Sequence, residues 1–434
     1  MGNPPFAGYS LQTKEQKADI LSIYTDEKGK PYKTAGKIDY VSGWYFKTSE
    51  LIRGTNIKAA LVSTNSITQG EQVASVWQPL FDRFNIHIDF AHRTFRWDSE
   101  ANLKAHVHCV IIGFSCTVNP EKFIFSNGRK QIAQNINPYL VDAPDVFIES
   151  RNKPICDVLK ICAGGKPVEG GFLILTKEEK TDFLKKEPNA EKFIRQFISA
   201  DDYINNTPRY CLWLQNVSPN ELRQMPHVME RIEKVKEYRM SSTKPATREC
   251  ANTPHLFMEI KQPLNDYMII PATSSENRRY IPLGFVKSDT ILNNAACYID
   301  NATLYHFGIL TSNVHMAWMR AVCGRLKSDY RYSNTIVYNN FPWCEPTDVQ
   351  KEKIEKTAQG ILDARDLYPD CSLADLYNEL TMPSELRKAH QENDKAVMEA
   401  YGFKKKDENG KTKWFTEPET VACLMEMYKT LTQG

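Results

Sequence analysis

The chain has 434 residues, more than one hydrophobic core usually organises, so we expect two or three domains. Hydrophobic residues make up 41% and charged residues 25% of the sequence, a composition typical of globular proteins that excludes wholesale disorder. The formal net charge is +2, so any contact with a polyanion depends on local basic patches rather than on a global field.

The eleven cysteines are scattered, without a Cys-x-x-Cys pair or the spacing of a zinc module, which predicts a reducing, intracellular compartment. No apolar run reaches the ~18 to 20 residues that a membrane span needs. The N-terminal residues also lack the basic and apolar segments of a secretory leader. We therefore expect a soluble, cytoplasmic protein with no membrane partner.

The N-terminal part of the chain carries the pattern of an α/β sheet. A helix is predicted from about Tyr40 to Arg53, and a strand over 58–64 follows it. Apolar residues at helical spacing predict a second helix over 70–84, and strands are predicted over 86–91 and 106–114. This order accounts for half of an α/β sheet, because a doubly wound domain contains several more strands.

The rest of the chain changes character twice. Residues 119–345 mix short strands and helices in an α+β pattern, and residues 348–400 predict amphipathic helices broken at Pro369 and Pro383. The turn signals in the middle region are Asn127-Gly128, Gly164-Gly165 and Gly170-Gly171, its predicted helices cover 177–199 and 218–238, and its predicted strands cover 256–260, 267–271 and 280–286. We therefore expect three domains, over residues 1–118, 119–345 and 346–434.

The tetrapeptide Asn3-Pro4-Pro5-Phe6 is the most informative motif in the sequence. Its two prolines fix φ and remove two backbone donors, so the loop is stiff and presents fixed acceptors, including the Asn3 amide oxygen. Such acceptors suit the exocyclic amino group of a purine, whose lone pair is delocalised. We expect Asn3 and Pro4 to bind the amine and Phe6 to stack on the ring. The alternative is an ordinary Asn-Pro turn.

Residues 92–97 interleave cations with aromatic residues in what we predict to be a hairpin region between two strands. Arg93 and Arg96 are expected to contact phosphates, and Phe95 or Trp97 to stack on an extruded base. Basic and aromatic residues at a strand end also commonly cap a core, which is the alternative explanation.

Two further polar features near the predicted sheet admit structural explanations. His106 and His108 alternate on one strand, but a third ligand at suitable spacing is missing, so we interpret them as strand or core histidines and predict no metal. The segment from Ser63 to Gln72 joins a strand to a helix, at the carboxyl end where α/β sites form. Helix capping alone would also explain this segment.

Cations among short polar residues in the middle region suit contacts with phosphates and base edges. For any single residue, a solvated surface position is the alternative, and only their joint occurrence in one region indicates DNA. These residues are Arg239, Lys244, Arg248, Arg278, Arg279, Arg320, Arg325, Lys327 and Arg331.

Several long motifs resemble those of MmeI-type DNA adenine methyltransferases of restriction-modification systems. In the N-terminal region they are Asn3 to Phe6, Asp39 to Tyr45, Ser63 to Gln72 and Phe90 to Trp97. In the middle region, which resembles that family's target-recognition domain, they are Phe193 to Ile198, Ser274 to Tyr280, His315 to Arg320, Gly324 to Ser333 and Asn339 to Trp343. The resemblance covers nearly the whole chain, including the C-terminal helical domain.

The resemblance implies transfer of a methyl group from S-adenosylmethionine to the N6 amine of a flipped adenine in double-stranded DNA. It implies the C-terminal half of a class I S-adenosylmethionine-dependent methyltransferase sheet in residues 1–118. A target-recognition domain and a small helical domain would follow. Asn3, Pro4, Pro5 and Phe6 would form the catalytic loop, with Phe95 and Trp97 stacking on the target base. The implied DNA-binding residues are Arg93, Arg96, Arg248, Arg278, Arg279, Arg325, Lys327 and Arg331.

One departure from the family concerns the cofactor. The family's cofactor-binding strand, helix and Gly-rich turn precede the Asn-Pro-Pro-Phe motif, whereas only Met1 and Gly2 precede it here. The glycines at 164, 165, 170 and 171 do not have the spacing of a Phe-x-Gly-x-Gly turn. We therefore expect a fragment or split gene product that lacks the cofactor-binding half and the restriction module and is inactive alone. An exposed sheet edge beside 58–64 is then expected to favour self-association or a separate chain carrying the missing half.

Two other functions stay open. The chain is alternatively a non-catalytic DNA-binding specificity subunit or remnant, which cofactor binding by a complementing partner would distinguish from an enzyme. Asn-Pro-Pro-aromatic loops also occur in enzymes that methylate glutamine amides or RNA bases, but such enzymes rarely need a recognition region of ~200 residues. A salt-dependent shift of duplex DNA discriminates between these substrates.

Overall fold

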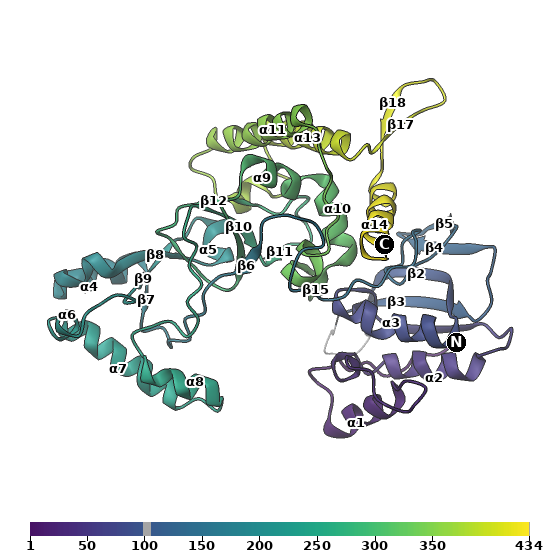
Figure 1. Cartoon of the computed structure of the whole chain (residues 1–434), viewed down its shortest axis with the longest axis horizontal. Coiled ribbons are helices and arrows are strands. Elements are labelled where there is room, and N and C mark those ends of the chain that lie inside the picture. The colour runs from purple at the N-terminus through teal and green to yellow at the C-terminus, as the bar shows by residue number, and fades with distance from the viewer. Residues whose placement is uncertain (99–105, 434) are drawn as a thin grey trace. The chain divides into compact units, whose positions relative to one another are not determined.

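The computed structural model describes residues 1–98 and 106–433 and divides into two compact units (Figure 1). Unit 1 combines residues 1–157, 317–344 and 402–434, and unit 2 combines residues 158–316 and 345–401. Each unit is assembled from segments that are distant in the sequence, so these units are a different division from the three expected domains, which stay a prediction. Among the described residues, no helix is both long and apolar enough to cross a membrane.

Unit 1 is built on a mixed five-stranded sheet with the order β1-β3-β2-β4-β5. Its strands are β1 (Ala59–Thr64), β2 (His87–Asp98), β3 (His106–Ser115), β4 (Lys122–Ser126) and β5 (Arg129–Ala133), which confirms the predicted strands at 58–64, 86–91 and 106–114. β3 lies between β1 and β2 and is antiparallel to both, so β1 and β2 run in the same direction. Their carboxyl ends therefore meet at one edge of the sheet, where α/β proteins place their sites.

The expected hairpin at residues 92–97 is corrected by the structure, because β2 continues through this segment to Asp98. Its aromatic and β-branched side chains suit an extended strand, and the segment pairs with β3, with Phe95 opposite Cys109. A register shift between His92 and Phe95 interrupts the ladder. Such an irregularity re-aims side chains locally, here near the end of the strand.

The helices of unit 1 cover the sheet and fix its edge loops. Its helices and helical turns are α1 (Lys14–Ile23), η1 (Ala35–Lys37), α2 (Ser42–Ile52), η2 (Asn65–Thr68), α3 (Glu71–Phe84), η5 (Asn334–Tyr338) and α14 (Glu417–Gln433). α2 and α3 confirm the two helices predicted at 40–53 and 70–84. The Tyr45 ring of α2 lies 5.2 Å from the Trp77 ring of α3 and 5.5 Å from the Phe114 ring of β3. This buried aromatic cluster packs both helices against the sheet.

Unit 2 contains two four-stranded sheets, with the orders β12-β10-β14-β6 and β13-β8-β9-β7. Their strands are β6 (Ile161–Ala163), β7 (Ile174–Leu175), β8 (Ile194–Ile198), β9 (Arg209–Leu212), β10 (Tyr267–Pro271), β12 (Gly284–Val286), β13 (Ile291–Leu292) and β14 (Ala296–Asp300), and β11 (Thr273–Ser274) is a further short strand. The strand predicted at 267–271 is thereby confirmed as β10. Apolar residues of β8 and β9 pack with α7 (Pro226–Met240) in one core cluster.

Three predicted elements of the middle region are corrected. The helix predicted over 177–199 ends early as α4 (Lys177–Lys186), because Pro188 begins a 3-10 turn and the β-branched and aromatic residues after it form β8. Residues 256–260 form no strand and contribute an isolated bridge at Glu259. The strand predicted over 280–286 is confined to β12.

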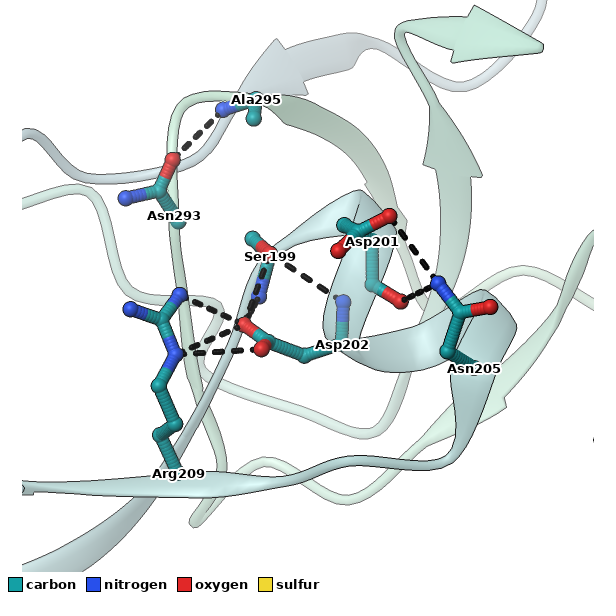
Figure 2. A network of polar contacts seen from close by, with 7 residues as sticks. All are labelled: Ser199, Asp201, Asp202, Asn205, Arg209, Asn293 and Ala295. Atoms are coloured by element: carbon teal, nitrogen blue, oxygen red, sulfur yellow. Dashed lines mark hydrogen bonds and ion pairs between the residues drawn. The ribbon is translucent and has the colours of Figure 1, made fainter. Parts of the chain in front are cut away.

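A polar network fixes α5 (Ala200–Asn205) beside β9 (Figure 2). The Asp202 carboxylate accepts hydrogen bonds from the Ser199 backbone N–H at 2.8 Å and from Nη2 of Arg209 at 2.7 Å. Burial raises the pKa of Asp202, but the hydrogen bonds from Arg209 and Ser199 outweigh this effect and hold the pKa below its ordinary value. The carboxylate therefore stays ionised and ties the helix to the sheet.

The remaining helices include those predicted in the C-terminal region. They are α6 (Pro219–Arg223), α8 (Pro245–Glu249), η4 (Cys250–Asn252), α9 (Leu304–Thr311), α10 (Asn313–Val322), α11 (Asp348–Asp366), α12 (Leu373–Leu376) and α13 (Ser384–Ala400). Pro369 and Pro383 lie between α11 and α13, as expected for helix-breaking residues. The helical pattern is interrupted before α14 by a hairpin of β17 (Lys404–Lys406) and β18 (Thr412–Trp414).

Candidate active site

The Asn3-Pro4-Pro5-Phe6 loop leaves the sheet at the edge formed by the carboxyl ends of β1 and β2. Gly2 pairs with β1 in parallel register, because its N–H donates to Ala60 O and its carbonyl accepts from Val62 N, both at 3.0 Å. Pro4 is buried, whereas Asn3, Pro5 and Phe6 are exposed. The loop is therefore anchored at one residue and presents its polar and aromatic groups to solvent.

Asp39 holds the segment after this loop against the end of β1. One carboxylate oxygen accepts a hydrogen bond from Tyr9 N at 2.9 Å, and the other accepts from Ser66 Oγ at 2.5 Å. The neighbouring backbone adds a further bond, because Tyr40 N donates to Ala7 O at 2.9 Å. Sequence reasoning gave Asp39 no role. The available signal was its place at the start of the Asp39 to Tyr45 motif, and its partners Tyr9 and Ser66 are distant in the sequence.

The polar segment from Ser63 to Gln72 is partly structural. Ser63 is buried, and its Oγ lies 3.0 Å from the hydroxyl oxygen of Tyr45 in α2. Asn65 is half-buried and its Nδ2 donates to Thr94 Oγ1 at 3.4 Å, which connects the end of β1 with the end of β2. The expected position at a carboxyl edge is thus observed, with Ser63 facing the core and Asn65 facing the edge.

The aromatic residues proposed to stack on a base lie at the same level of the sheet as the end of β1. Thr64 of β1 and Phe95 of β2 are both paired with Cys109 of β3, from opposite sides. The ring of Phe95 is 6.2 Å from the ring of Trp97, which is 44% exposed. With strands about 4.8 Å apart, Phe95 lies roughly 10 Å across the sheet from Thr64.

The two arginines of β2 have different environments. Arg93 is half-buried, and its Nε donates to Leu140 O at 2.8 Å. Burial lowers the pKa of the Arg93 guanidinium. Arg96 is exposed on the strand. Arg93 therefore binds the protein's own backbone, and the phosphate contact of Arg96 stays a prediction.

A basic hairpin of unit 1, β15 (Gly324–Leu326) and β16 (Asp329–Arg331), carries three of the predicted DNA contacts. It begins two residues after Val322, whose carbonyl accepts a hydrogen bond from Gly70 N at 3.1 Å. Gly70 and Gly324 lie so close together that a Cβ atom added to Gly70 would be 3.3 Å from the Gly324 backbone. The hairpin therefore begins beside the polar segment of the sheet edge. The predicted contacts Arg325, Lys327 and Arg331 therefore belong to the compact unit that contains the Asn3 loop.

Within this hairpin, Lys327 and Arg331 are exposed and Arg325 is half-buried. The Arg325 guanidinium lies 3.9 Å from the centre of the Tyr330 ring and donates to Ser328 O at 2.9 Å. Lys327 occupies the turn with φ +57°, a conformation that is uncommon outside glycine. The turn therefore presents Lys327 outward while Arg325 stiffens the ribbon.

The other predicted DNA contacts lie in unit 2. Arg248 is exposed on α8 and donates to Ser242 O at 2.7 Å. Arg279 is exposed, and Arg278 is half-buried beside it in the segment before β12. The neighbouring Tyr280 raises the pKa of Arg279 and lies with its ring centre 5.7 Å from the guanidinium.

Two middle-region arginines that we expected near DNA are corrected. Arg239 is fully buried and donates to five backbone carbonyls, including Leu256 O at 2.7 Å. Its guanidinium organises the interior of unit 2, because a buried cation needs its donors satisfied. Arg320 forms a paired contact with the Glu417 carboxylate at 2.8 and 2.9 Å, so its charge is neutralised within unit 1.

Metal-ligating side chains do not gather at this edge in the part of the chain that the structure describes. Residues 1–98 and 106–433 contain no group of three or more His, Cys, Asp or Glu side chains that could hold a metal ion. His108 lies on β3 opposite Arg96, and the side chain of His106 lies outside the described residues. All eleven cysteines lie within the described residues, and none of them forms a disulfide bond.

Models of one protein family match three successive parts of the chain. The MmeI DNA-methyltransferase domain matches residues 1–126, the MmeI target recognition domain matches residues 142–345, and the MmeI C-terminal domain matches residues 346–434. Together these matches cover nearly all of the sequence.

Two relatives give the same result. DNA methyltransferase A of Bacillus subtilis (strain 168) is 40% identical over 433 residues, which cover 100% of this chain and 48% of that protein. The structure of the type IIL restriction-modification enzyme MmeI in complex with DNA is 47% identical in sequence, with a TM-score of 0.90, and the match covers 100% of this chain and 57% of that chain. The chain thus spans about half the length of these relatives. It belongs to the MmeI family of restriction-modification DNA methyltransferases.

Proposed function

We propose that the chain recognises double-stranded DNA and forms the target-base side of an adenine-N6 methyltransferase site in a restriction-modification system. The observation that carries this proposal is the Asn3 to Phe6 loop at the carboxyl edge of the unit 1 sheet, in which Asn3, Pro5 and Phe6 are exposed. The same unit holds an exposed indole at Trp97 and the basic β15–β16 hairpin. The solved relative, an MmeI enzyme in complex with DNA, supports DNA as the partner.

The chemistry assigned to the loop follows from its acceptors. The Asn3 amide oxygen and the Pro4 carbonyl accept hydrogen bonds from the two N6 hydrogens of an everted adenine. These bonds draw the nitrogen lone pair out of conjugation with the ring, which makes the amine a better nucleophile. Phe6 stacks on the purine, and Pro5 limits movement of the loop.

Asp39 acts as a positioning residue for this loop. It connects the backbone at Tyr9 with Ser66 at the end of β1, so the acceptors keep a fixed orientation without reorganisation. Binding through preorganised acceptors is worth more than binding through a mobile loop, because the ordering entropy has already been lost on folding.

S-adenosylmethionine supplies the methyl group when it is bound. The loop's groups are hydrogen-bond acceptors and an aromatic ring, which suit the amine and the base. Among the described residues we find no Gly-rich turn of the family's type, and we assign no residue to holding the cofactor. Two predictions remain for measurement. The chain alone should transfer no methyl group from labelled S-adenosylmethionine to DNA adenine, and sedimentation should reveal self-association or a partner chain.

The test begins with selection of duplexes bound by the chain from a randomised pool. We expect an enriched sequence that contains an adenine, and replacing that adenine by 2-aminopurine should give increased fluorescence on binding, because an everted base loses its stacking. DNA of the source cell should carry N6-methyladenine at the selected sequence. Introducing Asn3→Ala into the source gene should remove that mark.

A matched control is Asn216→Ala, which changes another exposed asparagine, in the turn after β9. This variant should keep both the fluorescence increase and the methyl mark. Failure to enrich any duplex, or an unmodified selected sequence in cells that make the protein, would contradict the proposed function. DNA binding with eversion but without methylation would instead support a non-catalytic specificity subunit.

A further inference from the structure

We infer that the β17–β18 hairpin, residues 404–414, is a second DNA-contacting ribbon that grips the phosphates of duplex DNA outside the β15–β16 hairpin. The inference rests on the proposed function, since it assumes that duplex DNA is the partner. It adds a sequence-independent contact surface in the C-terminal part of the chain, where the sequence pattern predicts only helices.

The hairpin is a short ribbon anchored at its base. Phe403 and Phe415 flank the two strands and stack with ring centroids 5.6 Å apart and an interplanar angle of 10°. At the tip, the Asp407 carboxylate accepts hydrogen bonds from Asn409 N at 2.9 Å and Lys411 N at 2.8 Å. Figure 1 shows the ribbon extending from the beginning of α14. The base and the tip of the ribbon are therefore fixed by contacts that do not involve lysine side chains.

The ribbon carries an unusual local charge. Residues 404–414 contain five lysines and two acidic residues, whereas the net charge of the whole chain is only +2. All five lysines are exposed: Lys404, Lys405, Lys406, Lys411 and Lys413. Of the two acidic residues, Asp407 is already bound to the backbone at the tip. The ribbon is therefore a local basic patch of the kind that a polyanion requires.

The strand register distributes this charge over both faces of the ribbon. Lys405 is directly opposite Lys413, and Lys406 is opposite Thr412. Because side chains alternate along a strand, Lys405, Lys411 and Lys413 share one face and Lys404 and Lys406 share the other. A two-stranded ribbon fits a groove of B-DNA, whose two walls both carry phosphates. Positive charge on both faces matches that environment.

The arrangement is unfavourable for the hairpin taken by itself. Like charges directly opposite each other in an antiparallel pair are destabilising, and an isolated two-stranded hairpin is marginally stable. Lys405 gains an acidic partner in Glu419 of α14. In the described part of the chain, Lys406, Lys411 and Lys413 have no carboxylate within ion-pair distance. Phosphates of a bound duplex supply the missing counter-charge, and this complementarity identifies the partner as DNA rather than an apolar surface.

The experiment compares the full chain with the triple variant Lys406→Gln, Lys411→Gln, Lys413→Gln. Fluorescence anisotropy with a labelled duplex is recorded over a range of salt concentrations. We expect the triple variant to bind selected and unrelated duplexes more weakly by a similar factor. The slope of log affinity against log salt should become shallower by about 3, or about 1 for each phosphate that the variant no longer neutralises.

The matched control is Lys47→Gln, Lys185→Gln, Lys353→Gln, which removes the same charge from three helices. Each of these lysines already pairs with an acidic residue, at 2.8, 2.8 and 2.6 Å respectively. The control should keep the wild-type slope, and a Lys→Arg version of the hairpin triple variant should restore it. The substituted side chains are exposed, so we expect all variants to fold like the wild type. Thermal unfolding of each variant checks this.

The possible outcomes separate the inference from the proposed function. If the wild-type chain binds no duplex, the proposed function fails. If it binds and the hairpin variant has the wild-type slope, the ribbon inference alone is overturned. Loss of RNA binding with unchanged duplex DNA binding would likewise overturn it, in favour of an RNA partner.

Discussion

Two segments of unit 1 have nearly the same composition and opposite uses. Asn3 to Phe6 and Asn339 to Trp343 both combine asparagine, proline and an aromatic residue. Asn3 is exposed at the edge of the sheet. Asn340 is fully buried, and its Nδ2 donates to the carbonyls of Glu149 at 3.0 Å and Thr335 at 2.8 Å. The first segment presents its asparagine to solvent, and the second uses its asparagine inside the protein.

The difference teaches that burial, rather than residue type, decides what a stiff polar turn does. A buried carbonyl without a donor costs about 1–3 kcal/mol, so an interior turn uses its asparagine amide to satisfy the backbone. A turn at a strand's carboxyl end projects out of the sheet, and its amide remains available to another molecule. Arginines follow the same division: Arg239 serves buried carbonyls, and Arg331 is exposed on a hairpin.

The largest expected effect concerns the buried arginine. Arg239→Met removes a guanidinium donor from each of five carbonyls and should lower the free energy of unfolding by about 3–5 kcal/mol, measured by urea denaturation. The exposed counterpart Arg331→Met should change stability by less than about 0.5 kcal/mol and weaken DNA binding instead. Equal losses of stability in both variants would remove the distinction between the two sites.

The next effect concerns the exposed asparagine. Asn3→Ala removes the acceptor proposed for the target amine and should lower methylation of the selected sequence by about 100-fold or more, because preorganised polar contacts contribute on this scale. Its unfolding free energy should stay within about 0.5 kcal/mol of wild type. The measurement is the methylated fraction of the sequence in cells, together with urea denaturation. Full methylation by this variant would refute the assigned role.

A buried asparagine variant tests the same comparison from the other side. Asn340→Ala removes the amide donor from the carbonyls of Glu149 and Thr335, of which Thr335 keeps a bond from Arg151 N, and should destabilise the chain by about 2 kcal/mol. At temperatures where the variant is folded, DNA affinity should be unchanged. Thermal unfolding and anisotropy measure the two properties separately. A folded variant of normal stability would show that water can replace this amide.

The smallest effect is the pH dependence of the Asp202 network in unit 2. The folded-state pKa of Asp202 is depressed below its unfolded value of about 3.9, so the stabilisation is complete above about pH 4 and is lost as the pH falls through the folded pKa. Asp202→Asn should therefore destabilise the chain by about 1–2 kcal/mol at pH 7. The difference in unfolding free energy between this variant and the wild type should become smaller below about pH 4, as measured by urea denaturation at a series of pH values. A gap that is independent of pH would contradict this assignment.

Local patterns were sufficient for the regular elements of unit 1. Apolar spacing predicted α2 and α3, β-branched runs predicted the three strands, and Asn127-Gly128 predicted the turn between β4 and β5, where Gly128 has φ +73°. The same reasoning failed at residues 92–97 and 177–199. In the first case pairing with β3 extends the strand, and in the second Pro188 and a strand partner, β9, end the helix. Both corrections involve pairing with a neighbouring strand, and in the second case Pro188 adds a local stop signal.

The sequence by itself determined the stiffness of the Asn3 to Phe6 loop, the kinds of chemical group that it offers, and the family to which its longer motifs point. These properties depend on neighbouring residues, and proline geometry and donor or acceptor character are the same in any fold. Only the tertiary structure decided that Asp39 anchors this loop, that Arg239 and Arg320 are used internally, and that five lysines near the C-terminus share one exposed ribbon. Burial and pairing depend on which distant segments fold together, and no local pattern of residues specifies that.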